Sequence, residues 1–164
     1  MSLPNRHLGI ERLFPNITHS GYTITSPETK DYNCIAWAGH NADLWWWPDS
    51  SLTYFWPKGI MREESIEAFI SAYQTIGFSV CDSPDYENDF EKIAIFVDQL
   101  GTPTHAARQL DKTTWTSKLG SSFDISHAFD GVSGDGIPKK NYGKPKVFMK
   151  RPKQIAQQNM EVSE

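Results

Sequence analysis

One amphipathic stripe gives the clearest structural signal in this chain and lies within residues 62–76. Large apolar side chains recur there at the i, i+3, i+4, i+7 spacing of a single helical face, namely Ile66, Phe69, Ile70, Tyr73 and Ile76. Gly77 follows directly, at a position where glycine commonly ends a helix. The sequence therefore predicts a helix over residues 62–76.

Extended segments surround this helix and predict an α+β fold. Runs rich in β-branched and aromatic residues, bounded by turn residues, are typical of strands, and they occur at residues 78–81, 92–97, 104–110, 115–118 and 147–149. Residues 121–146 are rich in Gly, Ser, Pro and Asp and predict a long loop with one short helix near 124–129. We predict one domain over residues 1–150, with an irregular segment at 1–30 that includes an extended piece at 22–25, and a disordered tail at 151–164.

Composition excludes several classes of protein. A formal net charge of −4 argues against a general nucleic-acid binder, which is usually basic. No window approaches the roughly 20 apolar residues that span a bilayer, and residues 1–11 lack the apolar core of a secretory signal. We therefore expect a cytoplasmic protein with no membrane partner and two free thiols, Cys34 and Cys81. The five histidines and two cysteines do not occur at zinc-ligand spacing, so neither a metal site nor a cofactor is expected.

Cys34 stands where a helix is expected to begin. Asp31 or Asn33 is suited to cap a helix that starts near it. A thiol at this position lies near unpaired backbone N–H groups, which favour the thiolate and can stabilise an oxyanion. A buried cysteine without chemistry is the other interpretation, and for Asn33 an oxyanion role and a purely capping role both remain open.

His105 opens the strand at 104–110, and the polar turn at 111–114 predicts a hairpin. Such a hairpin brings residues 115–118 antiparallel to this strand, so that Ser117 lies near His105 and orients its imidazole. A shift of one residue in register exchanges the faces and presents Lys118 instead. His105 is thus a candidate base, and a histidine with a purely structural role is the alternative.

These segments together resemble the papain-like cysteine hydrolases of the NlpC and CHAP type. In that group a cysteine begins a helix, a buried strand follows, a histidine opens the next strand, and a third polar residue lies about twelve positions on. Cys34, residues 92–97, His105 and Ser117 follow this order over roughly residues 31–120, and Ser117 stands twelve residues after His105.

The chain also departs from that group. The third residue is usually His, Asn, Gln, Asp or Glu, and serine is unusual there. Other candidates for orienting His105 are Asp98, Asn33, Asp124 and His127. The cysteine of the enzymes is often preceded by Asp and followed by Ser-Gly, whereas Asn33 and Ile35 flank Cys34. The motifs at 32–38 (YNCIAWA), 45–48 (WWWP) and 104–120 (THAARQL…WTSKLG) also look like those of an uncharacterised bacterial family.

Aromatic side chains cluster after the cysteine segment. Trp45, Trp46, Trp47, Tyr54 and Trp56 suit a platform for a peptide, acyl or sugar chain, since aromatic side chains provide large contact area at low entropic cost. Of the tryptophans, we predict substrate contacts for Trp37, Trp46, Trp47 and Trp56. Simple packing in the core is the competing interpretation.

The resemblance implies a papain-like fold, in which the Cys34 helix packs on a small antiparallel sheet, and a thiol-protease-like activity. The predicted function is a cysteine hydrolase or acyl transferase acting on an amide or ester, such as a peptide, isopeptide or peptidoglycan stem. Cys34 would be the nucleophile, His105 the base, Ser117 the orienting group, and Asn33 part of the oxyanion site. The alternative is an inactive interaction module that binds a protein partner through its aromatic surface, within a toxin, effector or defence system.

Overall fold

The computed structural model describes residues 3–153. Four short helices occur in this part of the chain: α1 (Leu8–Leu13), α2 (Ile17–Ser20), α3 (Cys34–Ala38) and α4 (Ile66–Gln74). The strands are β1 (Tyr22–Ser26), β2 (Ser79–Cys81), β3 (Phe90–Val97), β4 (Pro103–Gln109), β5 (Trp115–Lys118), β6 (Asp124–His127) and β7 (Lys144–Pro152). The fold is therefore α+β, as the sequence predicts.

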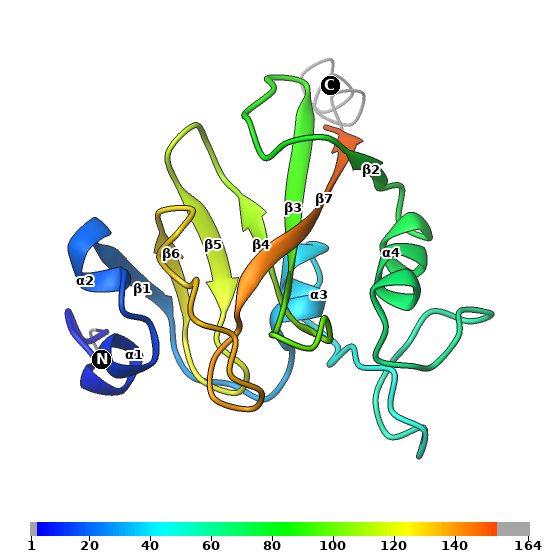
Figure 1. Ribbon diagram of the computed structural model, residues 1–164, viewed down its shortest axis with the longest axis horizontal. Helices are drawn as coiled ribbons and strands as arrows, with labels where there is room; N and C mark the ends of the chain where they lie inside the picture. Colours follow the sequence, from blue (N-terminus) through cyan, green and yellow to red (C-terminus); the bar gives the residue numbers. More distant parts are fainter. Residues whose placement is uncertain (1–2, 154–164) are drawn as a thin grey trace, which may run out of the picture.

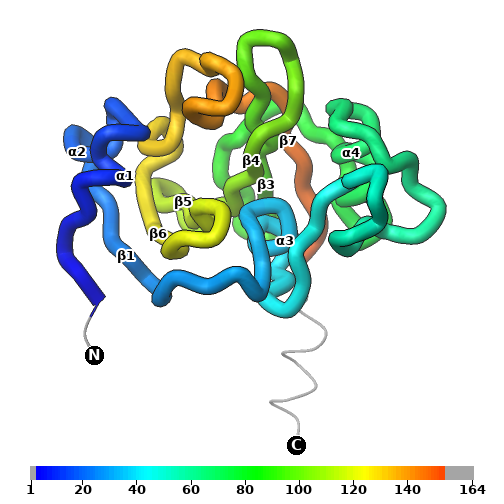
Figure 2. The backbone as a smooth tube through the Cα atoms, turned by 90° about the horizontal axis from the view of Figure 1, so that it is seen from below, coloured from blue at the N-terminus to red at the C-terminus, as the bar shows by residue number. Residues whose placement is uncertain are grey.

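All seven strands form one antiparallel sheet in the order β1-β6-β5-β4-β3-β7-β2. Helix α3, which carries Cys34, packs on β4 and β5 at the middle of this sheet. Helix α4 lies at the β2 end, and the N-terminal helices lie at the β1 end (Figures 1 and 2). The predicted packing of the Cys34 helix on an antiparallel sheet is confirmed.

Two apolar clusters cover the two faces of the sheet. The first, which we call the helix-side core, joins α3 and α4 to the sheet through residues such as Ile35, Phe69, Tyr73, Ile95 and Ala106. The second, the loop-side core, joins the N-terminal helices and the segment before β7 to the other face through residues such as Ile10, Phe14, Phe96, Ala107 and Ile125. Consecutive side chains of a strand point to opposite faces, so neighbours such as Ile95 and Phe96 fall into different cores.

Helix α4 forms where the apolar stripe predicts a helix, although it is shorter than the predicted range of residues 62–76. The Ser65 side chain accepts a hydrogen bond from the Ala68 N–H and caps the first turn. Helix α4 then runs to Gln74, and Gly77 adopts a positive φ of 98° just beyond it. The residues before Ser65 precede the cap, so the predicted start at residue 62 is too early.

Three predictions about irregular segments are wrong. Residues 124–129 do not form a helix: residues 124–127 are the strand β6, held by β5 on one side and β1 on the other. Residues 1–30 include two helices, because Ile10 and Ile17 find an apolar face to cover. The last strand extends to Pro152, and Arg151 donates to Glu91 at 2.8 Å, so residues 151 and 152 of the predicted tail belong to β7. The rest of that tail, residues 154–164, lies outside the described residues.

Gly143 allows the segment before β7 to approach the sheet closely. Its φ is 78°, and a Cβ atom at this position would lie 2.0 Å from the Val97 carbonyl oxygen. Only glycine tolerates both the backbone conformation and the contact. The approach fixes the neighbouring residue, Tyr142, against β4, and Tyr142 is part of the candidate site.

Candidate functional site

Cys34 is the first residue of α3, and Asn33 caps that helix. The Asn33 Oδ1 accepts hydrogen bonds from the Ala36 N–H at 3.2 Å and the Trp46 N–H at 3.0 Å. Its Nδ2 donates to the Trp46 carbonyl at 2.7 Å. Asn33 therefore fixes both the start of the helix and the tryptophan segment beside it. Of the two roles left open by the sequence, capping is the one that this geometry shows.

The Cys34 thiol is buried, with 6% of the residue exposed. Burial raises the pKa of the thiol to about 11, although hydrogen bonds from the backbone of Ala106, Ile35 and Cys34 itself act in the opposite direction. The resting thiol is therefore protonated at neutral pH. A base must remove its proton before it can act as a nucleophile.

His105 lies in β4 and is fully buried. Its ring stacks on the ring of Tyr142, with centroids 3.9 Å apart and planes within 4°, and meets Phe96 edge-on at 5.4 Å. Burial lowers the pKa of the imidazole well below its usual value, and the nearby His127 adds to this effect. His105 is therefore neutral at physiological pH.

A chain of three buried polar side chains begins at His105. The Nε2 atom of His105 lies 2.9 Å from the Ser117 Oγ, which lies 2.7 Å from the Nε2 of His127. The Nδ1 of His127 lies 2.6 Å from the Ala128 carbonyl oxygen. The predicted proximity of Ser117 to His105 is thus present, and His127, one of the alternative candidates, extends the same chain.

The Ala128 carbonyl sets the direction of the protons along this chain. A carbonyl only accepts, so the His127 Nδ1 must carry a hydrogen. Burial lowers the pKa of His127 to about 4, so its ring is neutral and its Nε2 accepts from the Ser117 hydroxyl. The Ser117 oxygen then accepts from the His105 Nε2–H. Neutral His105 is left with an unprotonated Nδ1, and this buried atom has no hydrogen-bond partner among the described residues.

Tyr142 lies beside both Cys34 and His105, because it lines the same cavity as the thiol and its ring stacks on the imidazole. Ala106, whose backbone acts to lower the pKa of the Cys34 thiol, belongs with Cys34 to the helix-side core, whereas the ring of His105 lies against Phe96 of the loop-side core. In the described part of the chain, β4 pairs with β5 only at Arg108–Thr116 and Gln109–Trp115, so the ladder does not continue beside His105. No hydrogen bond joins the thiol to the imidazole within residues 3–153. The structure thus places Cys34 beside the strand residue next to His105 and leaves the pair unbonded.

A cavity of about 340 Å³ connects the thiol to the surface. Its lining contains no Asp, Glu, Lys, Arg or His, and half of its residues are aromatic: Asn33, Cys34, Trp45, Trp47, Tyr54, Thr104, Gly120 and Tyr142. A second cavity, of about 470 Å³, shares Trp47, Thr104 and Tyr142 with it. We call these two adjoining cavities the thiol groove, and the second of them is also lined by Leu100 and Lys139.

The predicted aromatic contacts divide between the thiol groove and the core. Trp47 lines the groove. Trp46 and Trp56 are buried in the helix-side core, and Trp56 donates to the Met61 carbonyl at 3.0 Å. Trp37 donates to the Thr116 hydroxyl at 3.0 Å and lies under Arg108. Packing is thus the observed role of these three tryptophans.

Sequence reasoning missed Tyr142 and Thr104 as residues of this site. Tyr142 comes from the segment before β7, and no motif links it to Cys34. The proposed alternatives Asp98 and Asp124 are engaged elsewhere: Asp98 accepts from backbone N–H groups of its own turn, and Asp124 accepts from the Tyr32 hydroxyl at 2.7 Å. They do not contact His105.

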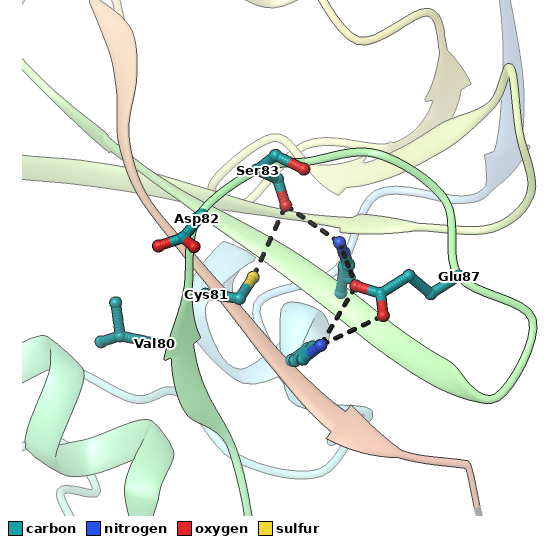
Figure 3. A pocket seen from close by; sticks show the side chains of 7 residues that line it. Val80, Cys81, Asp82, Ser83 and Glu87 are labelled. Carbon is teal, nitrogen blue, oxygen red and sulfur yellow. Dashed lines mark hydrogen bonds and ion pairs between the residues drawn. The ribbon is translucent and has the colours of Figure 1, made fainter.

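The other cysteine lies in a different cavity, between β2, β3 and β7 (Figure 3). The Cys81 sulfur and the Lys92 ammonium both donate to the Ser83 carbonyl, at 3.5 and 3.0 Å. Glu87 binds Lys92 at 2.7 Å and Lys150 at 3.1 Å. Glu87 and the two lysines of this cavity are thus paired with one another, and Cys81 provides an internal control for the chemistry of Cys34.

Residues 3–153 contain neither a membrane-spanning helix nor a cluster of metal-ligating side chains. No helix there is long and apolar enough to cross a membrane. No three His, Cys, Asp or Glu side chains in that range are grouped so that they could hold a metal ion.

Comparison with known proteins identifies a family but no activity. No curated protein and no solved structure matches the chain. One family model, described as "Domain of unknown function (DUF7689)", matches residues 23–150. This range extends from β1 into β7 and includes Cys34, His105, Ser117 and His127, and the chain therefore belongs to the DUF7689 family.

Proposed function

We propose that this protein is a cysteine hydrolase or acyl transferase with a papain-like arrangement of its site, acting on an amide or ester. The observation that carries the proposal is the unpartnered Nδ1 of His105. Buried polar atoms are nearly always hydrogen-bonded, so an orphan needs an explanation. Here the orphan is a basic lone pair, oriented by a polar chain through the other ring nitrogen, on the strand residue next to the one that contacts the thiol.

The proposed reaction begins from a neutral thiol and a neutral imidazole. As substrate enters the thiol groove, the Cys34 proton passes to His105 Nδ1 and the sulfur attacks the carbonyl carbon, forming the C–S bond. The Cys34 backbone N–H, in the first turn of α3, stabilises the oxyanion. When the tetrahedral intermediate collapses, the bond to the amine or alcohol breaks and Nδ1 returns its proton to that leaving group.

In the release of the acyl group, His105 Nδ1 again takes a proton from the attacking group and gives it to the leaving group. Water, or an acceptor amine or alcohol, attacks the thioester while Nδ1 takes its proton. The C–S bond then breaks, and Nδ1 protonates the departing sulfur. In both halves the thiol and Nδ1 must come within hydrogen-bond reach, so we propose that substrate binding closes this pair.

The thiol groove points to an acyl group without charge next to the reacting carbonyl. An ionised side chain buried beside Trp45, Trp47 and Tyr54 would lose its hydration without gaining a partner. Uncharged aliphatic or aromatic groups instead gain contact with these rings. Charged groups farther along the substrate can meet Lys139, Lys140 or Glu64 in the continuing cavity.

Acylation of the protein by 4-nitrophenyl butyrate tests the proposal. We expect release of nitrophenolate and a butyryl thioester located at Cys34 by mass spectrometry. Cys34→Ala should abolish both, Cys81→Ala should leave both unchanged, and His105→Gln should slow acylation about 10²–10⁴-fold. Equal, slow acylation of the two cysteines, or a rate unaffected by His105→Gln, would refute the enzyme proposal.

A second function is favoured by the lack of a hydrogen bond between the Cys34 thiol and the His105 imidazole within the described residues. A protonated thiol with no bonded base suits a binding module that holds an extended segment of a protein partner in the thiol groove. Such a module would bind equally well after Cys34→Ala, and would lose binding after Trp47→Ala. Peptide binding that survives Cys34→Ala, without any acylation of the wild type, would favour this function.

A further inference from the structure

The chain from His105 to Ala128 contains one rotatable proton whose direction decides the chemistry of the site. The Ser117 hydroxyl has a single hydrogen and lies between two imidazole nitrogens, at 2.9 Å from His105 and 2.7 Å from His127. It can donate to only one of them. Donation to His105 would require an unprotonated Nε2 there, and neutral His105 would then carry its hydrogen on Nδ1.

His127 excludes that second arrangement. For Ser117 to donate to His105, the oxygen would have to accept from a His127 Nε2–H, and neutral His127 would then present an unprotonated Nδ1 to the Ala128 carbonyl. Two acceptors would face each other at 2.6 Å inside the protein. The lost hydrogen bond and the repulsion between the two lone pairs both carry a cost, which the Gly131 N–H that also donates to this carbonyl at 3.0 Å does not remove. His127 thus fixes the hydroxyl of Ser117, and Ser117 fixes the tautomer of His105.

We infer that His127 is a positioning residue that keeps the Nδ1 of His105 free to accept a proton. The inference rests on the proposed function for its role in catalysis, and on the hydrogen-bond geometry for the tautomer itself. It also explains why serine, an unusual orienting group, is sufficient here: the hydroxyl acts as a link, and the carbonyl at the far end supplies the direction.

Packing in the loop-side core does not require the hydrogen-bonded chain of His105, Ser117 and His127. His105, Ser117 and His127 are 0%, 0% and 3% exposed, and they lie among the apolar side chains of the loop-side core. Apolar residues of similar volume would fill the same space without the cost of desolvating polar groups.

The tautomer can be measured directly, without any activity. In ¹⁵N-labelled wild-type protein at pH 7.5, the two-bond ¹⁵N–¹H pattern of His105 should show a protonated Nε2 and an unprotonated Nδ1. His127→Leu removes the acceptor for the Ser117 hydroxyl, so His105 should populate both tautomers. His127→Gln keeps an acceptor oxygen in reach of Ser117 and should retain the wild-type pattern. His19→Leu, at an exposed position, is the matched control.

Kinetics with 4-nitrophenyl butyrate provide the second readout. We expect His127→Leu to lower kcat at least tenfold with little change in KM, and His127→Gln to remain within a few-fold of the wild type. A wild-type signal with Nδ1 protonated would overturn the inference, as would an unchanged tautomer in His127→Leu. If the wild type shows the expected tautomer but no acylation at Cys34, the proposed function fails and the tautomer assignment stands.

Discussion

Acid should destabilise this protein through its buried histidines, and His127 allows the effect to be calculated. Burial lowers the pKa of His127 from 6.5 to about 4, against smaller opposing effects from the Ala128 carbonyl and Asp130. The pKa is lower in the folded than in the unfolded state. Between these two pKa values the unfolded state therefore binds more protons, and stability falls as the pH decreases.

The size of the effect follows from proton linkage. With these two pKa values, His127 alone removes about 2 kcal/mol of unfolding free energy between pH 7 and pH 5, and about 3 kcal/mol in total by pH 4. His105, whose pKa burial also lowers, acts in the same direction. Replacing His127 with Gln removes its titration while leaving that of His105.

Urea unfolding followed by tryptophan fluorescence measures this effect. The difference in unfolding free energy between wild type and His127→Gln should shift by about 2 kcal/mol from pH 7 to pH 5, in the direction that favours the variant at low pH. His19→Gln, at an exposed site, should run parallel to the wild type. If the wild type and His127→Gln also remain parallel within about 0.5 kcal/mol, then His127 is not buried and neutral as the structure shows.

Two further substitutions test how the site is held in place, by urea unfolding at pH 7. Asn33→Ala should lower the unfolding free energy by about 2–4 kcal/mol, because it removes a helix cap and leaves buried backbone groups of Trp46 unpaired. The control is Asn16→Ala, which should be nearly neutral because the Asn16 side chain caps no helix. Equal effects of the two substitutions would contradict the capping role of Asn33. Gly143→Ala should cost about 2–4 kcal/mol because its Cβ would overlap the Val97 carbonyl, whereas Gly101→Ala, with a similar φ and open space, should cost about 1 kcal/mol. A loss no larger than that of Gly101→Ala would rule out the close approach.

Local patterns predicted the elements that local physics controls. The stripe from Ile66 to Ile76 indicated α4, and the turn at 111–114 indicated the hairpin that brings Ser117 to His105. Residue type and position left Asp31 and Asn33 as candidate caps, and Asn33 is the one that caps α3. Each of these depends on interactions between residues that are close in sequence, or on one hairpin.

Long-range packing decided what the sequence left open or misassigned. Residues 124–127 have no strong local preference, and they become a strand because β5 and β1 pair with them on both sides. That pairing places His127 beside Ser117, which no spacing in the sequence reveals.

The sequence by itself indicated that a cysteine begins a helix and that a hairpin brings the strand of Ser117 antiparallel to that of His105, but it left the register of that hairpin open. Only the tertiary structure decided that Tyr142 stacks on His105 while lining the cavity of Cys34, and that a carbonyl at Ala128 directs the proton chain. The physical reason is that successive side chains of a strand point to opposite faces of the sheet. The register of distant strands therefore determines which side chains share a face.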